Sequence, residues 1–340
     1  MKIFLTGATG FIGTHLADAL IGKGYEVCCL VKSPGQAKNL KQKGCHTITG
    51  DLTDIHLGRK ISPELTNTDL VIHLAALFAE WGPSKGDYQE VNVEGTTRLL
   101  QASWENRVEH FILISTAHVL GNPPNHTPAA ETDTPHPDSG YAHSKLAAEK
   151  KAVAYFNKGL PVTILRPTFV YGPGDSRGAF FRFFQRIKNG RVIIVGSGRN
   201  FFQPLFVEDL VAAILAAAKK PGRGEIYLIA GRQQIRLQQL LKLLAKSLKV
   251  RNPKIIRLPY LLSLAVSYPA STLFTLGRML HLPILRDEPF LEPRKVKFST
   301  GSFTYKITRA ETDLGYRPRH NLKIGLRETA ESLEKSFPLL

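Results

Sequence analysis

The chain has 340 residues and a formal net charge of +17, with 43% hydrophobic and 21% charged residues. This length allows a full α/β core with a smaller second lobe, and the balance excludes an intrinsically disordered chain. Its three cysteines, Cys28, Cys29 and Cys45, support neither a disulfide framework nor a metal site, so we predict a reducing cytoplasm and no metal.

The first predicted strand, residues 2–6, leads into a glycine-rich turn and then a helix over residues 11–23. Glycine has no Cβ, so the backbone can turn sharply and approach a pyrophosphate closely. The N–H groups at the start of a helix can then bind the negative charge. Strand, turn and helix in this order predict a dinucleotide site. The predicted cofactor-binding residues of this turn are Gly7, Gly10, Phe11, Ile12 and Gly13.

The second predicted strand, residues 26–31, is followed by Lys32 and Ser33. An acidic side chain at this position would bind the ribose hydroxyls of NAD, whereas a cation and a hydroxyl suit a 2′-phosphate. We therefore favour NADP over NAD. The alternative is that Lys32 is simply solvated.

Strands and helices continue to alternate through the first half of the chain. Further strands are predicted at 46–49, 69–74, 110–115 and 162–166, and helices at 84–106 and 139–157. Such alternation is typical of a parallel sheet with helices on both faces.

Two features carry chemistry. Ser115 and Thr116 stand at the carboxyl end of a predicted strand, where ligands bind in open α/β sheets. Tyr141 and Lys145 are four residues apart, early in a helix capped by Ser139 or Asp138, so they share one helix face. A nearby ammonium favours the phenolate, so we expect the pKa of Tyr141 to move from about 10 toward neutral, where tyrosine can exchange a proton.

The glycine turn, the strand-end hydroxyl and the YxxxK pattern, in this order, resemble the extended short-chain dehydrogenase/reductases. The resemblance covers residues 1–175 and implies an α/β fold with a Rossmann-type doubly wound parallel sheet. It also implies NAD(P)-dependent hydride transfer. The catalytic residues that it implies are Thr116, Tyr141 and Lys145. The further cofactor-binding residues that it implies are Asp51, Leu52, Ala75, Ala76, Asn92, Ser115, Tyr141, Lys145 and Pro167.

The second half matches more loosely. We expect residues 1–175 to form the cofactor domain and residues 176–340 mainly a substrate lobe, with some segments returning to the first domain. Short strands at 191–195 and 225–230 and helices at 208–219 and 236–248 are assigned to that lobe. Residues 196–217, together with Leu314–Pro318, resemble the 3β-hydroxysteroid/sterol dehydrogenase and dihydroflavonol-reductase-like branch.

Residues 258–277 carry no charged side chain but are interrupted by Pro259 and Pro269. Three interpretations compete: a buried helix pair that closes an apolar pocket, an interfacial membrane patch, and a membrane span. The net charge fits either an anionic membrane surface or an ordinary solvated surface, and we expect no nucleic acid partner.

We therefore predict a cytoplasmic enzyme, with peripheral membrane attachment left open. It would move hydride between the nicotinamide and a secondary alcohol or ketone of an apolar, sterol-, steroid- or flavonoid-like molecule. The competing interpretation is a nucleotide-sugar epimerase or dehydratase with tightly held NAD. The expected partner is a small molecule, and a homodimer is left open.

Overall fold

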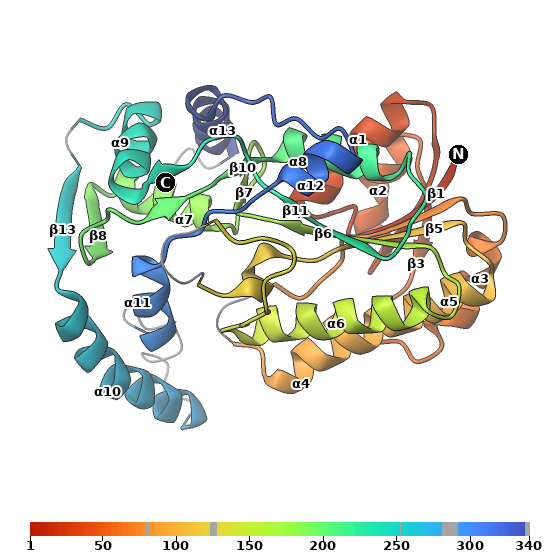
Figure 1. Cartoon of the computed structure of the whole chain (residues 1–340), viewed down its shortest axis with the longest axis horizontal. Coiled ribbons are helices and arrows are strands. Elements are labelled where there is room, and N and C mark those ends of the chain that lie inside the picture. The colour runs from red at the N-terminus through yellow and green to blue at the C-terminus, as the bar shows by residue number, and fades with distance from the viewer. Residues whose placement is uncertain (79–81, 123–127, 252, 281–291, 337–340) are drawn as a thin grey trace.

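The computed structural model describes residues 1–78, 82–122, 128–251, 253–280 and 292–336. At its centre lies a seven-stranded sheet in the order β11-β6-β5-β4-β1-β2-β3, in which every paired strand is parallel (Figure 1). The predicted Rossmann-type α/β fold is confirmed. The strands are β1 (Lys2–Thr6), β2 (Glu26–Val31), β3 (His46–Thr49), β4 (Leu70–His73), β5 (His110–Ile114), β6 (Val162–Pro167) and β11 (Glu225–Ile229).

Helices cover both faces of this sheet (Figure 1). On one face, α1 packs against α8 and buries Leu16, Leu20 and Ile214 in a shared apolar core. On the other face, Leu99 of α5 and Phe111 of β5 belong to a second core. The helices of the first face are α1 (Phe11–Gly22), α2 (Pro34–Gln42), α8 (Val207–Ala217) and α12 (Thr308–Asp313), and those of the second are α3 (Leu57–Leu65), α5 (Gly95–Glu105) and α6 (Gly140–Phe156).

The chain reverses its winding between β1 and β4. Strands β2 and β3 continue the sheet on one side of β1, and β4, β5 and β6 continue it on the other. In such sheets, ligands bind outside the carboxyl ends of the strands at this switch point. The glycine turn follows β1, so it lies at that position.

The predicted helical stretch 84–106 is confirmed, but it is not one regular α-helix. It consists of α4 (Lys85–Tyr88), a π-helical turn η1 (Gln89–Glu94) and α5. A π-turn widens the helix and is often found at functional sites. Here it carries Asn92.

The remaining elements lie outside the central sheet, and most of them contribute side chains to a third apolar core that includes Phe184, Leu241 and Leu326. These elements are β7 (Val170–Tyr171) paired with β10 (Leu205–Phe206), β8 (Arg191–Val195) with β13 (Lys254–Leu258), β9 (Phe201–Phe202) with β12 (Ile235–Arg236), and η2 (Ala117–Leu120), α7 (Ala179–Lys188), α9 (Leu237–Ser247), α10 (Tyr260–Met279), α11 (Pro293–Thr300) and α13 (Leu322–Ser336).

Strand β11 does not belong to the smaller lobe, to which the sequence analysis assigned it. It pairs along its whole length with β6 and completes the central sheet. The side chains of its run Ile226–Ile229 pack against apolar residues on both faces of the sheet. The spacing of apolar residues in such a run does not indicate to which lobe the strand belongs. The division of the chain at residue 175 stays a prediction.

The apolar stretch 258–277 is not a buried helix pair. Most of it lies in one helix, α10, which continues through Pro269 and leaves Leu261 and Leu262 exposed to 77% and 60%. Among the described residues, no helix is both long and apolar enough to cross a membrane.

Candidate active site

The glycine turn brings the start of α1 close to the backbone that follows β4. Gly7 has φ +77°, and a Cβ there would lie 2.7 Å from the amide nitrogen of Ala75. A Cβ on Gly13 would collide with the carbonyl oxygen of Gly7. Both positions therefore require glycine, because the neighbouring atoms belong to the backbone.

The N-terminus of α1 is open. Gly10 is its N-cap, is exposed, and supplies no capping side chain. The first N–H groups of a helix have no partner within it and carry the positive end of the helix dipole. Phe11 and Ile12, half-buried, begin the helix. The turn thus offers unshielded donors for a pyrophosphate, which fits a dinucleotide.

The end of β2 carries an ion pair rather than an isolated cation. Lys32 Nζ lies 3.1 Å from Asp51 Oδ2, and both side chains are partly exposed. Burial alone would raise the pKa of Asp51, but hydrogen bonds from Thr53 and Lys32 hold that pKa below its ordinary value. The neighbouring Leu52 is buried and would contact any Cβ added to Gly95. The ion pair therefore brings two of the predicted cofactor-binding residues, Lys32 and Asp51, into contact.

A buried histidine that sequence reasoning missed organises the end of β4. His73 Nδ1 lies 2.6 Å from Thr6 Oγ1, and His73 Nε2 lies 2.9 Å from Thr96 Oγ1. Burial, with a smaller contribution from the Lys145 charge, lowers the pKa of His73 to about 3, so its ring is neutral. Thr6 Oγ1 also accepts a hydrogen bond from the Ala75 N–H, at 3.2 Å, and so fixes the strand end before Ala76.

Asn92 joins this strand end to α6. Its side chain pairs twice with the backbone of Leu77, accepting at 2.7 Å and donating at 3.1 Å. Its amide also donates to Ser144 Oγ at 2.9 Å, and that hydroxyl donates to the Tyr141 carbonyl at 2.7 Å. Asn92 therefore positions the helix turn that carries Tyr141 and Lys145.

Ser115 and Thr116 follow β5, as predicted. The Ser115 N–H donates to the Leu165 carbonyl at 2.7 Å, yet its buried hydroxyl has no partner within the described part of the chain. Thr116 is buried, and its hydroxyl accepts the His118 N–H at 3.3 Å where η2 begins. An unsatisfied buried hydroxyl is costly and indicates a ligand partner.

Ser139 is the N-cap of α6, and its hydroxyl accepts the Ala142 N–H. Tyr141 is half-buried, with its ring edge-on to Phe78 at 5.0 Å between centroids, whereas Lys145 is only 1% exposed. The predicted fall in the pKa of Tyr141 is wrong in this structure. Burial, with a contribution from Tyr88, raises it above its ordinary value of 10. Desolvation disfavours the charged phenolate, so burial moves this pKa in the direction opposite to the expected one.

Burial also acts on Lys145. It lowers the pKa of that side chain from 10.5 to about 8, although the charge of Glu149 opposes the shift. Glu149 lies one turn further along α6 and makes a buried, bidentate pair with Arg166 of β6, at 3.0 and 2.7 Å. Sequence reasoning missed Glu149, although its i+4 spacing from Lys145 puts it on the same helix face. The next residue of β6, Pro167, is also buried.

An aromatic cluster stands next to Thr116. The ring of His118 packs on Phe169 at 4.9 Å, Phe298 at 5.6 Å and Phe303 at 6.3 Å between centroids. Phe298 comes from α11, so a segment far along the chain reaches the end of β5. Phe169 and Phe303 are buried members of the third apolar core, so the cluster packs the end of β5 onto that core.

The structure thus separates two groups of predicted residues. The Lys32–Asp51 pair lies at β2 and Ser115–Thr116 at β5, on opposite sides of the β1–β4 switch point. An elongated ligand such as a dinucleotide can extend between them across the glycine turn.

Comparison with known proteins gives one family model and several full-length relatives. The family model described as "NAD dependent epimerase/dehydratase family" matches residues 3–230. A ketoreductase of 4-hydroxy-2-methyl-3-oxo-4-farnesyl-3,4-dihydroquinoline-1-oxide from Stigmatella aurantiaca is 26% identical, over 96% of this chain and 95% of its own. A 2-alkyl-3-oxoalkanoate reductase from Stenotrophomonas maltophilia is 27% identical, over 98% and 99%. The crystal structure of UDP-glucuronic acid 4-epimerase from Bacillus cereus, with UDP-glucuronic acid and NAD, superposes with a TM-score of 0.78 at 25% identity, over 99% and 100%.

Proposed function

Because the chain belongs to the NAD-dependent epimerase/dehydratase family and is an enzyme of the extended short-chain dehydrogenase/reductase type, we propose that it transfers hydride at a secondary alcohol or ketone carbon. The observation that carries this proposal is the meeting of three elements at one sheet edge. These are the open start of α1, the Ser115–Thr116 hydroxyls after β5, and the Tyr141–Lys145 face of α6.

The cofactor-binding residues fit NAD. The start of α1 would hold the pyrophosphate, the Lys32–Asp51 pair would face the adenosine ribose, and Lys145 would face the nicotinamide ribose. When bound, NAD supplies a nicotinamide ring that accepts or returns the hydride. A preference for NADP would require Lys32 to turn from Asp51 to a 2′-phosphate. We keep that preference as a separate proposal with its own test.

Tyr141 would act on the substrate oxygen. Its raised pKa keeps the phenol protonated at neutral pH, so it can donate a proton to a carbonyl oxygen as hydride reaches the carbon. Thr116 would hydrogen-bond the same oxygen, and the unpartnered Ser115 hydroxyl would offer a second polar contact. Asn92 and Ser144 would act by positioning the Tyr141 turn.

Two substrate classes have separate support. A nucleotide sugar, oxidised and reduced again at one carbon, is supported by the full-length similarity to a UDP-glucuronic acid 4-epimerase with bound NAD. The comparisons as a whole support this class better than a sterol-like substrate. An apolar ketone is supported by the two reductase relatives. The likeness to the 3β-hydroxysteroid branch stays a prediction.

One experiment tests the reaction and divides the substrate classes. The purified enzyme is given UDP-sugars with NAD, and in parallel a panel of steroid, flavanonol and 3-oxoacyl ketones with NADH or NADPH. A change in sugar configuration without net nicotinamide reduction identifies the first class, and ketone-dependent loss of nicotinamide absorbance identifies the second.

Tyr141→Phe removes the oxygen that exchanges the proton. With whichever substrate is active, turnover should fall at least ~100-fold, the usual scale for losing a general acid or base. Cofactor affinity, measured by fluorescence titration, should stay close to that of the unsubstituted enzyme. Tyr25→Phe, a half-buried tyrosine near the end of α1, is the matched control. Near-normal turnover of the Tyr141→Phe enzyme would disprove the mechanism.

A further inference from the structure

Helix α10 presents a continuous apolar surface to solvent. It lies at the outer edge of the molecule, away from the central sheet (Figure 1). Large apolar side chains usually face the protein core in a surface helix, so this pattern is inverted. The exposed large side chains of this surface, here called the α10 surface, are Leu261, Leu262, Val266, Tyr268, Leu273, Leu276 and Leu280.

Among the described residues of α10, the fully buried ones are small, whereas Leu264 and Phe274 are half-buried. Ser263 and Ser267 are buried, and their hydroxyls donate to the carbonyls of Pro259 and Leu264 within the same helix, at 2.8 and 2.7 Å. Small residues let α10 approach α11 closely, and the intrahelical bonds satisfy the hydroxyls. The α10 surface is therefore not needed to attach the helix to the protein.

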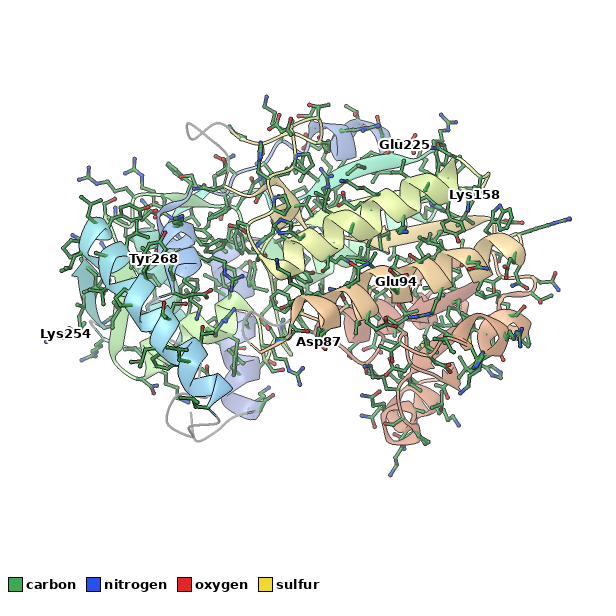
Figure 2. The ribbon with its side chains drawn as sticks, turned by 90° about the horizontal axis from the view of Figure 1, so that it is seen from below. Asp87, Glu94, Lys158, Glu225, Lys254 and Tyr268 are labelled. Atoms are coloured by element: carbon green, nitrogen blue, oxygen red, sulfur yellow. The ribbon has the colours of Figure 1, made fainter. Side chains whose placement is uncertain are left out.

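Basic side chains border the α10 surface. Lys254 and Arg257 are exposed on β13, which leads directly into α10, and Lys297 is exposed on the adjoining α11. Among the described residues between 251 and 300, one has an acidic side chain. This residue, Glu292, is buried and pairs with Arg294 at 2.6 Å. Figure 2 shows Lys254 and Tyr268 at the end of the molecule opposite Lys158. An apolar surface with a basic border is complementary to an anionic lipid surface.

We propose that α10 lies flat on an anionic membrane, with its apolar side chains among the lipids and Lys254 and Arg257 at the headgroups. A helix of 20 residues is about 30 Å long, which gives a long contact parallel to the membrane plane. A second copy of the chain is a poorer occupant, because each copy carries a net charge of +17 and like charges repel. The proposal does not depend on the substrate.

Helix α11 connects α10 to the residues that follow β5. α11 contacts α10, and its Phe298 packs on His118, two residues after Thr116. The membrane-facing helix and the end of β5 are thus linked through α11.

Vesicle co-sedimentation of the full chain tests the proposal. The protein is mixed with phosphatidylcholine vesicles, with or without phosphatidylglycerol, at low and high salt. We expect binding to the anionic vesicles at low salt. It should weaken as the screening length falls from about 10 Å at 0.1 M to about 3 Å at 1 M.

Two variants separate the apolar and the charged contributions. The first variant combines three substitutions, Leu261→Ser, Leu262→Ser and Leu273→Ser. It should bind vesicles at least ~10-fold more weakly at any salt concentration. Lys254→Glu with Arg257→Glu should weaken binding at least ~10-fold at low salt only. The matched controls are Ile55→Ser with Ile324→Ser, which change exposed apolar residues elsewhere, and Lys219→Glu with Lys220→Glu at the end of α8. Circular dichroism and thermal unfolding confirm that each variant is folded.

Three results would overturn the proposal. The first is no co-sedimentation with anionic vesicles at low salt. The second is equal loss of binding in the controls. The third is a stable dimer in sedimentation velocity that the serine variant dissociates, because a second copy would then cover the α10 surface.

Discussion

Replacing Lys145 with methionine removes a buried ammonium while keeping the length of the side chain. Lys145 is 1% exposed, and burial lowers its pKa from 10.5 in the unfolded chain to about 8. The unfolded state therefore binds more protons than the folded state between these two values. The free energy of unfolding should rise with pH in that window and stay flat below about pH 8.

The size of this effect follows from the two pKa values. One pKa unit corresponds to about 1.4 kcal/mol, so the enzyme should gain about 1 kcal/mol between pH 7 and pH 9 relative to the methionine variant. By pH 10 the gain should reach about 2–3 kcal/mol. At pH 7 the variant should be the more stable of the two, because it no longer buries a charge, although it will have lost catalysis.

Urea denaturation of both proteins at several pH values between 7 and 10 measures the difference directly. Other groups titrate in this range, but they are common to both proteins and cancel when the two curves are subtracted. Lys150→Met, on the exposed side of the same helix, controls for removing a lysine from α6. Identical pH slopes for the enzyme and Lys145→Met would refute the view that burial sets the lysine pKa.

Two further substitutions test the cofactor-binding residues. If Lys32 binds a 2′-phosphate, Lys32→Ala should lower the ratio of kcat/KM for NADPH over NADH by ~10–100-fold, the scale of a charge-assisted hydrogen bond. The control is Lys38→Ala, which changes an exposed lysine of α2 and should leave the ratio unchanged. An unsubstituted enzyme that prefers NADH would contradict the NADP proposal. Gly13→Ala should lower the free energy of unfolding by about 1–3 kcal/mol and weaken cofactor binding, because its Cβ meets the backbone of Gly7 and Ala8. The control is Gly22→Ala at the other end of α1, where an added Cβ meets nothing within 4 Å. It should be neutral or raise the free energy of unfolding by up to about 1 kcal/mol. Equal effects of the two substitutions in urea denaturation would contradict this reasoning.

Most of the central sheet could be predicted from the sequence, because its signals are local. The strands at 2–6, 26–31 and 46–49 have the predicted bounds, and α6 begins at the predicted Ser139 cap. Buried parallel strands are short apolar runs, and glycine turns and caps depend on residues a few positions apart. The i+4 spacing of Tyr141 and Lys145 is likewise local, so their common helix face follows from the helix itself.

Other features depended on contacts between distant segments. The pKa of Tyr141 rises because the packing around α6 removes water, which the proximity of a lysine could not reveal. Glu149 meets Arg166, and His73 meets Thr6 and Thr96, only when strands and helices assemble. Each of these partners lies more than 16 residues away in the sequence.

The apolar stretch 258–277 shows the same division most clearly. Its sequence established a charge-free apolar stretch with two prolines, and three interpretations remained. The tertiary structure decided which side faces outward: α10 contacts α11, Ser263 and Ser267 are buried, and Leu261 and Leu262 stay in solvent. Hydrophobic composition specifies that a surface must be covered, but only the positions of the neighbouring elements specify which surface the protein itself can cover.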